Sequence, residues 1–432
     1  MKHQLPVERR GTVLWSVAVI AAVVRVAAAG ILDGLRHPSL LEYDTIARNM
    51  VAGDGFSYAH HGVTYHSFAA PLHSWISAAS YWLTDSIVPV MLLQIGEGVA
   101  LSIVAAIIAG RVFGGWMAAA AAGLLVAVHP GQIVYNATIS HPLSFDALCF
   151  SLAVLAAMRL SERQTPWRAV QLGLVIGVGT LSRGTLVVFL PLVAAWFLAV
   201  TPRPAWKAML RSIVIAAACA AAVVAPCTIR NSLLHHQFVF LVTTDAEAFW
   251  RGNNVNATGH SYIDAERLVT TALPPGELDD LRAQPDEIAQ REWFSRRARA
   301  FILEHPDAFI RLTALKFFYF WWFAPQTGVL YPQTWLNWYK AFYVGTALLA
   351  VVGTLKVVRS GPPATHVVLL IACFLLSLSA LQSLYYVEGR HRWAVEPMML
   401  ILSGGGLAAL LPRPRRLSAL PDMRERHPAA GA

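Results

Sequence analysis

The chain has 432 residues, of which 56% are hydrophobic and only 14% are charged. Because soluble domains carry about 25% charged residues, this composition excludes an ordinary soluble protein and predicts one integrated membrane domain over residues 1–432. The net charge of +9 does not indicate binding to nucleic acid, since many Lys and Arg residues lie in short loops between apolar runs, where they set membrane topology.

The apolar runs predict an all-α polytopic membrane protein with about ten transmembrane helices, because a span needs about 20 apolar residues. The first run follows a basic N-terminus and continues to about residue 32 without a clear cleavage signal, so we interpret it as a retained span. The predicted spans lie near residues 12–31, 87–110, 115–129, 143–159, 168–182, 184–200, 208–227, 338–355, 364–385 and 393–411.

The distribution of Lys and Arg predicts the orientation of these spans. With the N-terminus inside, the short inner loops are rich in Arg and Lys, whereas the outer loop 130–142 contains neither. An even number of crossings then puts both termini, including the Arg-rich tail at 412–432, in the cytoplasm of a multi-pass inner-membrane protein. This count excludes residues 312–323 as a span, and their aromatic content indicates an interfacial or re-entrant segment.

Two outer regions are large enough to form structure beyond the membrane, at about residues 33–86 and 228–311. In the second region, Phe294, Ala298 and Phe301 recur at helical spacing and predict an amphipathic helix at the outer surface. Outer-side amphipathic and interfacial helices therefore complete the predicted fold.

The stretch at residues 38–56 predicts a short helix at the membrane surface. Ser39 is placed to cap its N-terminus, and Glu42, three residues later, completes a capping box. Gly53 is placed to end the helix in the left-handed conformation. The polar face presents Asp44, and a carboxylate held rigidly between a bilayer and a polar loop is a candidate catalytic group.

Each carboxylate of this helix also has a simpler explanation. A role in capping the helix would explain Glu42 without catalysis, and such a cap stabilises a helix by about 1 kcal/mol. Asp44 is spaced to pair with Arg48 one turn later, a contact worth roughly 0.3–0.5 kcal/mol. The stretch alone therefore leaves catalysis and helix stabilisation both open.

Five cationic residues are predicted on the same outer side as these carboxylates. A phosphate group on a lipid carrier lies at headgroup depth and is bound best by charge-assisted, bidentate donors, which Arg supplies. The alternative for each side chain is snorkelling, in which the charged end extends to the membrane interface without binding a ligand. We interpret the group as a donor-phosphate site, because the positive-inside rule does not account for so many outer cations. These residues are Arg183, Arg230, Lys316, Arg390 and Arg392.

Other polar groups receive structural roles or none. Arg25 and Glu97 lie inside predicted spans, and we expect them to form a buried structural pair. Histidines are frequent in the first outer region, but their spacing matches no strong zinc pattern. The sequence therefore predicts no required metal or cofactor, with a divalent metal as the less favoured alternative. These histidines are His60, His61, His66 and His73.

Several pieces of the chain, taken in order, resemble the C-type glycosyltransferases that use polyprenyl-phosphate sugars. That group includes the protein O-mannosyltransferases and the lipid A aminoarabinose transferases, and the resemblance spans nearly the whole chain. The pieces are 41–56 (LEYDTIARNMVAGDGF) with 70–72 (APL), 177–183 (GVGTLSR), 226–231 (PCTIRN), 249–253 (FWRGN) and 389–397 (GRHRWAVEP).

The resemblance implies that the acidic residue of the first outer loop is catalytic and that the outer arginines hold the donor phosphate. Many relatives carry an Asp four residues before the tyrosine, where this chain has Ser39, so the catalytic carboxylate is either Asp44 or Glu42. We prefer Asp44, because a capping role already explains Glu42. Residues in or beside the matching pieces are assigned to substrate binding, namely Tyr43, His66, Asn231, Trp250, Asn253 and Tyr386.

The leading hypothesis is a membrane glycosyltransferase that moves a sugar from a polyprenyl-phosphate donor to a glycan, lipid or protein acceptor on the outer side. A carboxylate would act as general base, and arginines would stabilise the leaving lipid phosphate. The sequence has no P-loop and no large inner loop, which argues against a soluble nucleotide-activated donor. The alternative is a transporter or flippase of a lipid-linked sugar, which predicts internal repeats that the sequence does not show.

Overall fold

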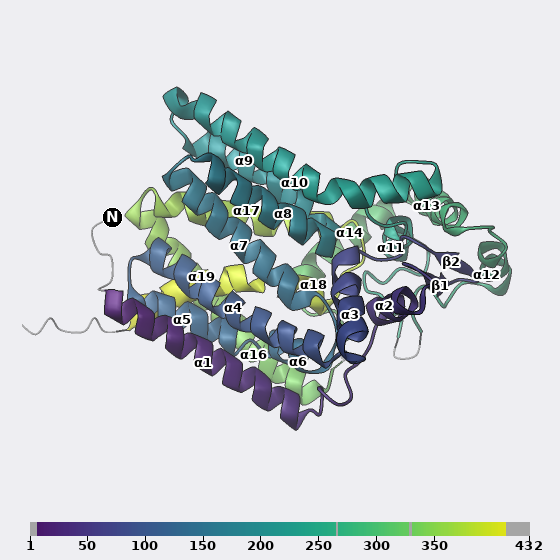
Figure 1. Cartoon of the computed structure of the whole chain (residues 1–432), viewed down its shortest axis with the longest axis horizontal. Coiled ribbons are helices and arrows are strands. Elements are labelled where there is room, and N and C mark those ends of the chain that lie inside the picture. Colours follow the sequence, from purple (N-terminus) through teal and green to yellow (C-terminus); the bar gives the residue numbers. More distant parts are fainter. Residues whose placement is uncertain (1–6, 265–266, 328–330, 412–432) are drawn as a thin grey trace, which may run out of the picture.

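The computed structural model describes residues 7–264, 267–327 and 331–411, so the tail predicted at 412–432 lies outside the described residues. Long helices form a bundle, and a smaller part, which we call the outer part after the side of the membrane that the sequence predicts for it, extends from one end of the bundle (Figure 1). The bundle contains α1 (Val7–Ile31), α4 (Val88–Phe113), α5 (Trp116–Ala127), α6 (Pro130–Thr138), α7 (Leu143–Glu162), α8 (Pro166–Ser182), η1 (Gly184–Val188), α9 (Phe189–Val200), η2 (Arg203–Ala205), α10 (Trp206–His235), α16 (Gln333–Ser360), α17 (Ala364–Gln382) and α19 (Glu396–Leu410).

The outer part combines segments that lie far apart in the sequence. Its two short strands pair antiparallel, with Tyr58 opposite Tyr65 and His60 opposite Val63. Both predicted outer regions contribute helices to it, and a five-residue helix near the C-terminal end of the chain packs against α14, α6 and α7. These elements are α2 (Glu42–Ala52), β1 (Tyr58–His60), β2 (Val63–Tyr65), α3 (Pro71–Thr84), α11 (Asp245–Arg251), α12 (Pro275–Arg282), α13 (Glu287–Glu304), α14 (Pro306–Trp321) and α18 (Gly389–Trp393).

The described helices confirm a polytopic all-α membrane fold, whereas the predicted count of ten spans is not confirmed. Six of the described helices are long and apolar enough to cross a membrane. The pair α5 and α6, bent by 48° at a short break, would make a seventh span. Two further apolar helices, η1 with α9 (Gly184–Val200) and α19 (Glu396–Leu410), are shorter than the six. At about 1.5 Å per residue, each falls short of about 30 Å of hydrocarbon.

Helix α10 is longer than the apolar run predicts. The expected span ends near Pro226, but the helix continues through this proline to His235. A proline inside a helix bends it without ending it when the neighbouring structure supports the chain on both sides. Arg230 and Asn231 therefore lie on the last turns of α10 and not in a loop.

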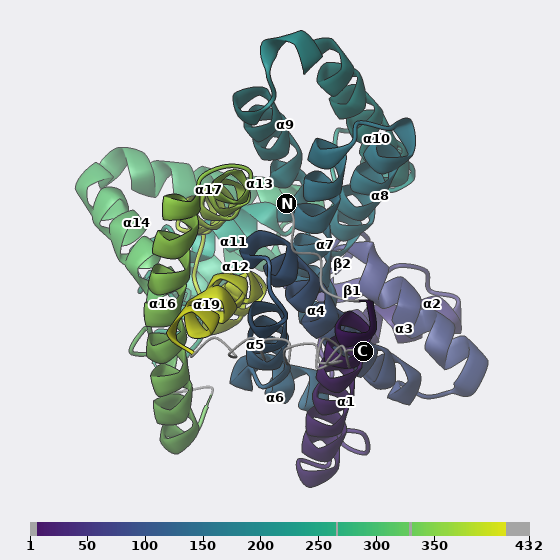
Figure 2. The ribbon, with the colours of Figure 1, turned by 90° about the vertical axis from the view of Figure 1, so that its left-hand side faces the viewer.

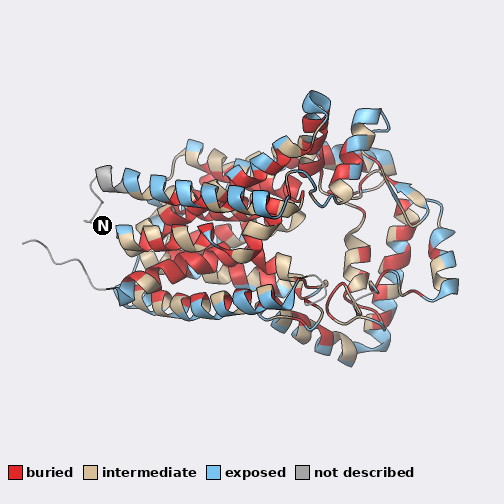
Figure 3. Cartoon of the chain, turned by 90° about the horizontal axis from the view of Figure 1, so that it is seen from below, coloured by how far each residue is buried: buried red, intermediate tan, exposed pale blue. Residues whose placement is uncertain are grey.

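The centre of the bundle is formed by α4 and α7. Figure 2 shows these helices between α5 and α19 on one side and α8 and α10 on the other. Within the most apolar 18-residue stretch of each helix, 61% of the residues of α4 and 78% of those of α7 are buried, against 22% for α1 and 28% for α10. The burial colours of Figure 3 follow this division, with red interior helices and pale blue outer faces. Residues at the outer end of α7 are therefore held by the most tightly packed part of the molecule.

The packing of α16 against α19 gives a first prediction. A Cβ placed on Gly406 would lie 1.9 Å from the carbonyl oxygen of Leu349, so Gly406→Ala should lower the stability by about 1–3 kcal/mol through overpacking. Gly345 lies in helix α16, and no described atom outside that helix lies within 4 Å of a Cβ placed there. Gly345→Ala should therefore leave stability unchanged or raise it by about 0.5–1 kcal/mol. Thermal unfolding in detergent measures both, and equal melting temperatures would contradict the packing.

The expected pair of Arg25 and Glu97 is wrong. Arg25 instead donates hydrogen bonds to the carbonyl oxygens of Ala127 (3.0 Å) and Val126 (3.4 Å), at the end of α5. The last carbonyls of a helix have no partner within it, and a buried guanidinium with several donors satisfies them directly. Within the part of the chain that the structure describes, no ion pair joins Arg25 to Glu97, and one Glu97 oxygen is buried without a hydrogen bond.

The amphipathic helix predicted in the second outer region is confirmed as α13. Phe294, Ala298 and Phe301 are buried, Arg296 and Arg299 are exposed, and the helix ends at Glu304. The buried face packs on α11 within the outer part, where an aromatic core has formed.

Candidate active site

Helix α2 lies where the sequence predicts it, but it begins differently. It starts at Glu42, its N-cap is Leu41, and no described side chain caps it, so the predicted capping box of Ser39 and Glu42 is wrong. Ser39 is held instead by a backbone bridge, in which its N–H donates to Thr138 (2.7 Å) and its carbonyl accepts from Ser140 (3.0 Å). The left-handed C-cap at Gly53 is confirmed, with φ of 98°. Glu42 therefore does not have the structural role that the sequence suggests.

Asp44 faces α3 and is fully engaged there. The hydroxyl of Tyr81 donates to its Oδ1, and Arg48 Nε donates to its Oδ2 at 2.9 Å. The side chain of Asp44 is only 7% exposed. Both carboxylate oxygens thus have partners, and Tyr81, which also accepts from Arg48 Nη2 at 2.8 Å, holds helix α2 against α3.

Tyr43 points into a group of polar residues at the outer end of the bundle. Its ring meets His73 edge-on at 5.2 Å and His141 at 5.9 Å between centroids. Burial raises the pKa of Tyr43, and the charges of Glu42 and Asp146 raise it further. The positive charges of two arginines lower the pKa of Tyr43 and so partly offset these effects.

These two arginines are Arg183 and Arg390, and their positive charges lower the pKa of both Tyr43 and His141. Burial, and then the charges of Arg390 and Arg183, hold the pKa of His141 well below its usual value. Burial alone lowers the pKa of His73 to about 4. At neutral pH the two histidines are therefore uncharged, and the two arginines supply the positive charge near Tyr43.

Arg183 is fixed by the start of α7. It follows Ser182, where α8 ends, and its Nε donates to Asp146 Oδ2 at 2.7 Å. Ser182 Oγ donates to the other oxygen of Asp146, also at 2.7 Å. The Arg183 side chain keeps 21% exposure while Asp146 holds its guanidinium in place.

Arg390 is fixed in a similar way by α18. Its Nη2 lies 3.0 Å from Glu388 Oε2, and its side chain keeps 27% exposure. Burial would raise the pKa of Glu388, but the charges of Arg390 and His391 lower it to about 2. Ser261 donates a hydrogen bond to Glu388, and His391 forms a capping box with it, so the whole turn is rigid.

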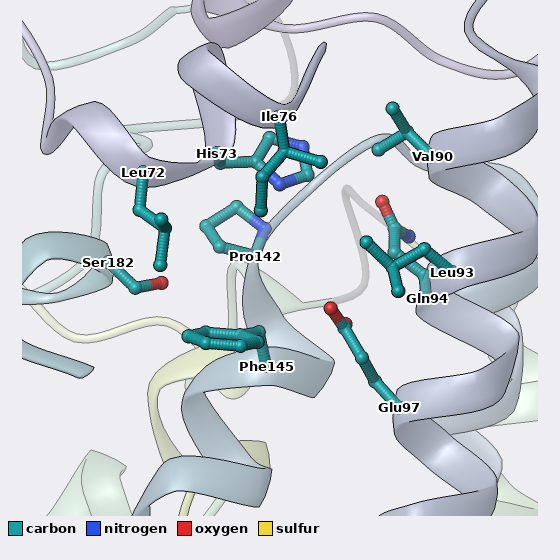
Figure 4. Close-up of a pocket in the computed structure, with 10 residues that line it drawn as sticks. All are labelled: Leu72, His73, Ile76, Val90, Leu93, Gln94, Glu97, Pro142, Phe145 and Ser182. Atoms are coloured by element: carbon teal, nitrogen blue, oxygen red, sulfur yellow. The ribbon is translucent and has the colours of Figure 1, made fainter. Parts of the chain in front are cut away.

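A small cavity lies beside this group, under the first turn of α3 (Figure 4). Its volume is about 10 Å³, which is room for no more than one water molecule. The carboxylate of Glu97 points into it from α4, opposite His73 and Pro142. The cavity is too small to hold a sugar.

A wider groove runs along the other side of the first turn of α3. It has a volume of about 280 Å³ and is lined by apolar side chains that include Phe56 and the exposed Trp75. Arg230 lies in its wall and donates to the carbonyl of His66 (2.6 Å) and to Asn231 Oδ1 (2.9 Å). Arg230, His66 and Asn231 thus form a second group, separate in its contacts from Arg183 and Arg390.

Four other predicted site residues are interior to the protein, namely Lys316, Asn253, Arg392 and Trp250, whereas Tyr386 is only partly buried. Lys316 is fully buried, and its Nζ donates to Gly252 O and Asn253 Oδ1, both at 3.0 Å. Arg392 is 3% exposed and contacts Tyr339 and Glu396. Trp250 packs in the aromatic core of the outer part, and Tyr386 lies under the guanidinium of Arg251 at 4.8 Å.

The environment of Lys316 gives a second prediction. Burial lowers the pKa of Lys316 to about 7 in the folded protein, from 10.5 in the unfolded chain. Between these values the unfolded chain binds the extra proton, so stability should rise with pH from about 7 to 10. Lys316→Met removes the titrating group, and its melting temperature relative to the natural chain should fall steadily over this range. A difference independent of pH would contradict a neutral buried lysine.

Four residues of the site are not predicted from the sequence, namely Asp146, Glu388, His73 and His141. Asp146 carries a usable signal, because an acidic residue at the edge of an apolar span is a functional candidate in its own right. The histidines give none, since their shared position depends on α3 packing over the loop between α6 and α7.

Part of the chain that contributes to this site matches a known family. Residues 68–229, which include His73, Asp146 and Arg183, match the model of the dolichyl-phosphate-mannose-protein mannosyltransferase family. No curated protein matches the chain.

Among solved structures, the chain shares its fold with the archaeal oligosaccharyltransferase AglB from Archaeoglobus fulgidus, solved with an inhibitory peptide and a dolichol-phosphate. The TM-score is 0.52 at 15% identity, covering 92% of this chain and 50% of AglB, so the chain spans half the length of that relative. ArnT from Cupriavidus metallidurans, bound to undecaprenyl phosphate, matches with a TM-score of 0.45 at 15% identity, covering 90% of this chain and 77% of ArnT. The family match over residues 68–229 and the fold shared with AglB confirm the resemblance to the C-type glycosyltransferases that the sequence predicts.

Proposed function

We propose that the protein is a membrane glycosyltransferase that takes a hexose or a pentose from a polyprenyl-phosphate carrier. One observation carries this proposal, namely that the charges of Arg183 and Arg390 both act on Tyr43 while their side chains keep 21% and 27% exposure. Two arginines in a fixed position match the charge and the bidentate geometry of a phosphate group. The acceptor is a glycan, a lipid or a protein on the outer side of the membrane.

The proposed general base is Glu42. Within residues 7–264, 267–327 and 331–411, no hydrogen bond or ion pair holds its carboxylate, and its charge acts on the hydroxyls of Tyr43 and Tyr58. Asp44 is the preferred base from the sequence alone, but both of its carboxylate oxygens already accept hydrogen bonds, from Tyr81 and Arg48. A base must have a free lone pair directed at the proton that it removes, which favours Glu42.

The reaction then needs two contributions from the chain. Glu42 takes the proton of the acceptor hydroxyl as its oxygen attacks the sugar. Arg183 and Arg390 stabilise the negative charge that remains on the lipid phosphate as it leaves. Because Asp146 and Glu388 already hold these cations in place, little reorganisation is required when the charge develops.

The groove beside Arg230 is the proposed path of the lipid chain. Its apolar lining, with Phe56 and Trp75, suits a hydrocarbon, and its wall includes Pro71 next to the first turn of α3. On the other side of that turn, His73 contacts Tyr43. A carrier lying in this groove would bring its headgroup toward the arginines.

Release of the carrier tests the proposal. Purified protein should copurify with a polyprenyl phosphate that mass spectrometry identifies, and Arg390→Gln should lose most of it. With an undecaprenyl-phosphate sugar and an acceptor extract, the protein should release undecaprenyl phosphate. A transporter would leave the sugar–lipid bond intact, so binding without release would overturn the proposal.

A further inference from the structure

A cluster of two histidines and one glutamate lies in the outer part, apart from the groups assigned above. His60 ends β1, His61 follows it in the turn of the hairpin, and Glu247 lies on α11. His60 Nε2 is 3.0 Å from Glu247 Oε2, and His61 Nε2 is 3.8 Å from Glu247 Oε1. One ligand atom from each residue lies within 4.8 Å of the others. Small side-chain rotations would place all three around one ion at the usual distance of about 2.0–2.2 Å, since ligands of a tetrahedral site are roughly 3–4 Å apart.

The hairpin turn holds His61 in an unfavourable backbone conformation. His61 has φ of 47° and Gly62 has φ of 86°, which are the positive angles of a type I′ turn. Asn, Asp and Gly are the usual residues at the first of these positions, and a left-handed residue with a larger side chain costs about 1 kcal/mol. Gln290 fixes the turn by donating to the carbonyl of His61 at 3.0 Å. The result is an imidazole directed at Glu247.

An ion at this cluster would replace the 3.0 Å hydrogen bond between His60 Nε2 and Glu247 Oε2. Among the described residues, the buried His61 Nε2 has no hydrogen-bond partner. Arg251 Nη2 donates to Glu247 Oε1 at 3.0 Å, which leaves Oε2 on the side of His60. The rings of Phe68 and Phe294 pack against the two imidazoles and limit the access of water.

We propose that His60, His61 and Glu247 bind one divalent cation of the zinc class, with water as the fourth ligand. Two imidazoles and one carboxylate are a ligand set that zinc favours over calcium or magnesium. The ion would join the hairpin that follows α2 to helix α11, although His60 and Glu247 are 187 residues apart. It would act as a clamp between the two outer regions and does not depend on the proposed transferase chemistry.

Zinc binding to the full chain tests the proposal. The protein is purified in detergent without a polyhistidine tag, stripped with a chelator, and given Zn²⁺ alone. The natural chain should retain one zinc per molecule after desalting, measured by elemental mass spectrometry. Its melting temperature should rise with added zinc and level off at one equivalent, because a ligand that binds only the folded state stabilises it.

Two variants remove a ligand while keeping the fold. His61→Asn suits the left-handed turn, so the stripped variant should melt at or above the natural chain while its zinc affinity falls at least about tenfold. Glu247→Gln still accepts from Arg251 and should show the same loss of affinity. His236→Asn is the matched control, because His236 also has a positive φ of 52° but belongs to no such cluster among the described residues.

A response to zinc that disappears in both ligand variants and persists in His236→Asn supports the clamp. A natural chain that retains no zinc and shows no thermal shift would overturn it, and so would a His61→Asn variant that binds zinc as tightly as the natural chain.

Discussion

Glu42→Gln should lower turnover by about 10²–10⁴-fold, because glutamine keeps the size of the side chain but cannot accept a proton as a base does. Donor binding should stay near that of the natural chain, since Glu42 pairs with neither Arg183 nor Arg390, which are held by Asp146 and Glu388. The melting temperature should also stay the same, because no described residue forms a hydrogen bond or an ion pair with this carboxylate. Initial rates of undecaprenyl phosphate release and equilibrium donor binding measure the two effects separately.

Asp44→Asn is the matched comparison. Its carboxylate accepts from Tyr81 and Arg48 in a buried position, so the variant should lose about 1–3 kcal/mol of stability. Turnover should fall less than about tenfold if the variant stays folded, because a structural carboxylate takes no proton in the reaction. An inactive but stable Asp44→Asn, together with an active Glu42→Gln, would assign the base to Asp44.

Arg183→Lys and Arg390→Lys should each weaken donor binding by about 10–100-fold. Lysine keeps the charge but loses the planar fork, and a hydrogen bond to a charged group is worth roughly 1.5–3 kcal/mol, or about tenfold per 1.4 kcal/mol. Each lysine can still pair with Asp146 or Glu388, so the fold should persist. Titration with a polyprenyl phosphate in detergent measures the affinity.

The control for these variants is Arg297→Lys. Arg297 pairs with Glu277 at 3.2 Å on the surface of the outer part, and its replacement should leave donor affinity unchanged. If Arg183→Lys and Arg390→Lys also bind normally, the phosphate lies elsewhere, and Arg230 in the wall of the groove becomes the next candidate.

Features that depend on local pattern can be predicted well from the sequence. Apolar runs identify the helices of the bundle, and the spacing of Phe294, Ala298 and Phe301 identifies α13 and its buried face. Gly53 is predicted correctly because a left-handed C-cap is decided by its own residue and the helix before it. Element boundaries that tertiary contacts decide, such as the passage of α10 through Pro226, are not predictable in this way.

Pairings between distant segments lie beyond what the sequence predicts. Ser39 does not cap α2, because its backbone is bound to residues 138 and 140, about a hundred positions later in the chain. Arg392 and Lys316 are basic residues in the sequence just as Arg183 is, yet Tyr339 and Asn253 hold them inside the protein. Only the fold decides that Arg183, Arg230 and Arg390 keep an exposed face among the five cationic candidates. Of these three, Arg183 and Arg390 are the ones whose charges act on Tyr43.

The contact of Arg25 with the end of α5 has a consequence for how the chain is made. Residue 25 lies in the first membrane helix, and its carbonyl partner at Ala127 is synthesised 102 residues later. An arginine at the centre of an isolated membrane helix costs about 2.5–3.5 kcal/mol, which the free helix α1 cannot recover from lipid. The stability of α1 in the bilayer is therefore expected to rise once α5 has been synthesised and can accept these hydrogen bonds.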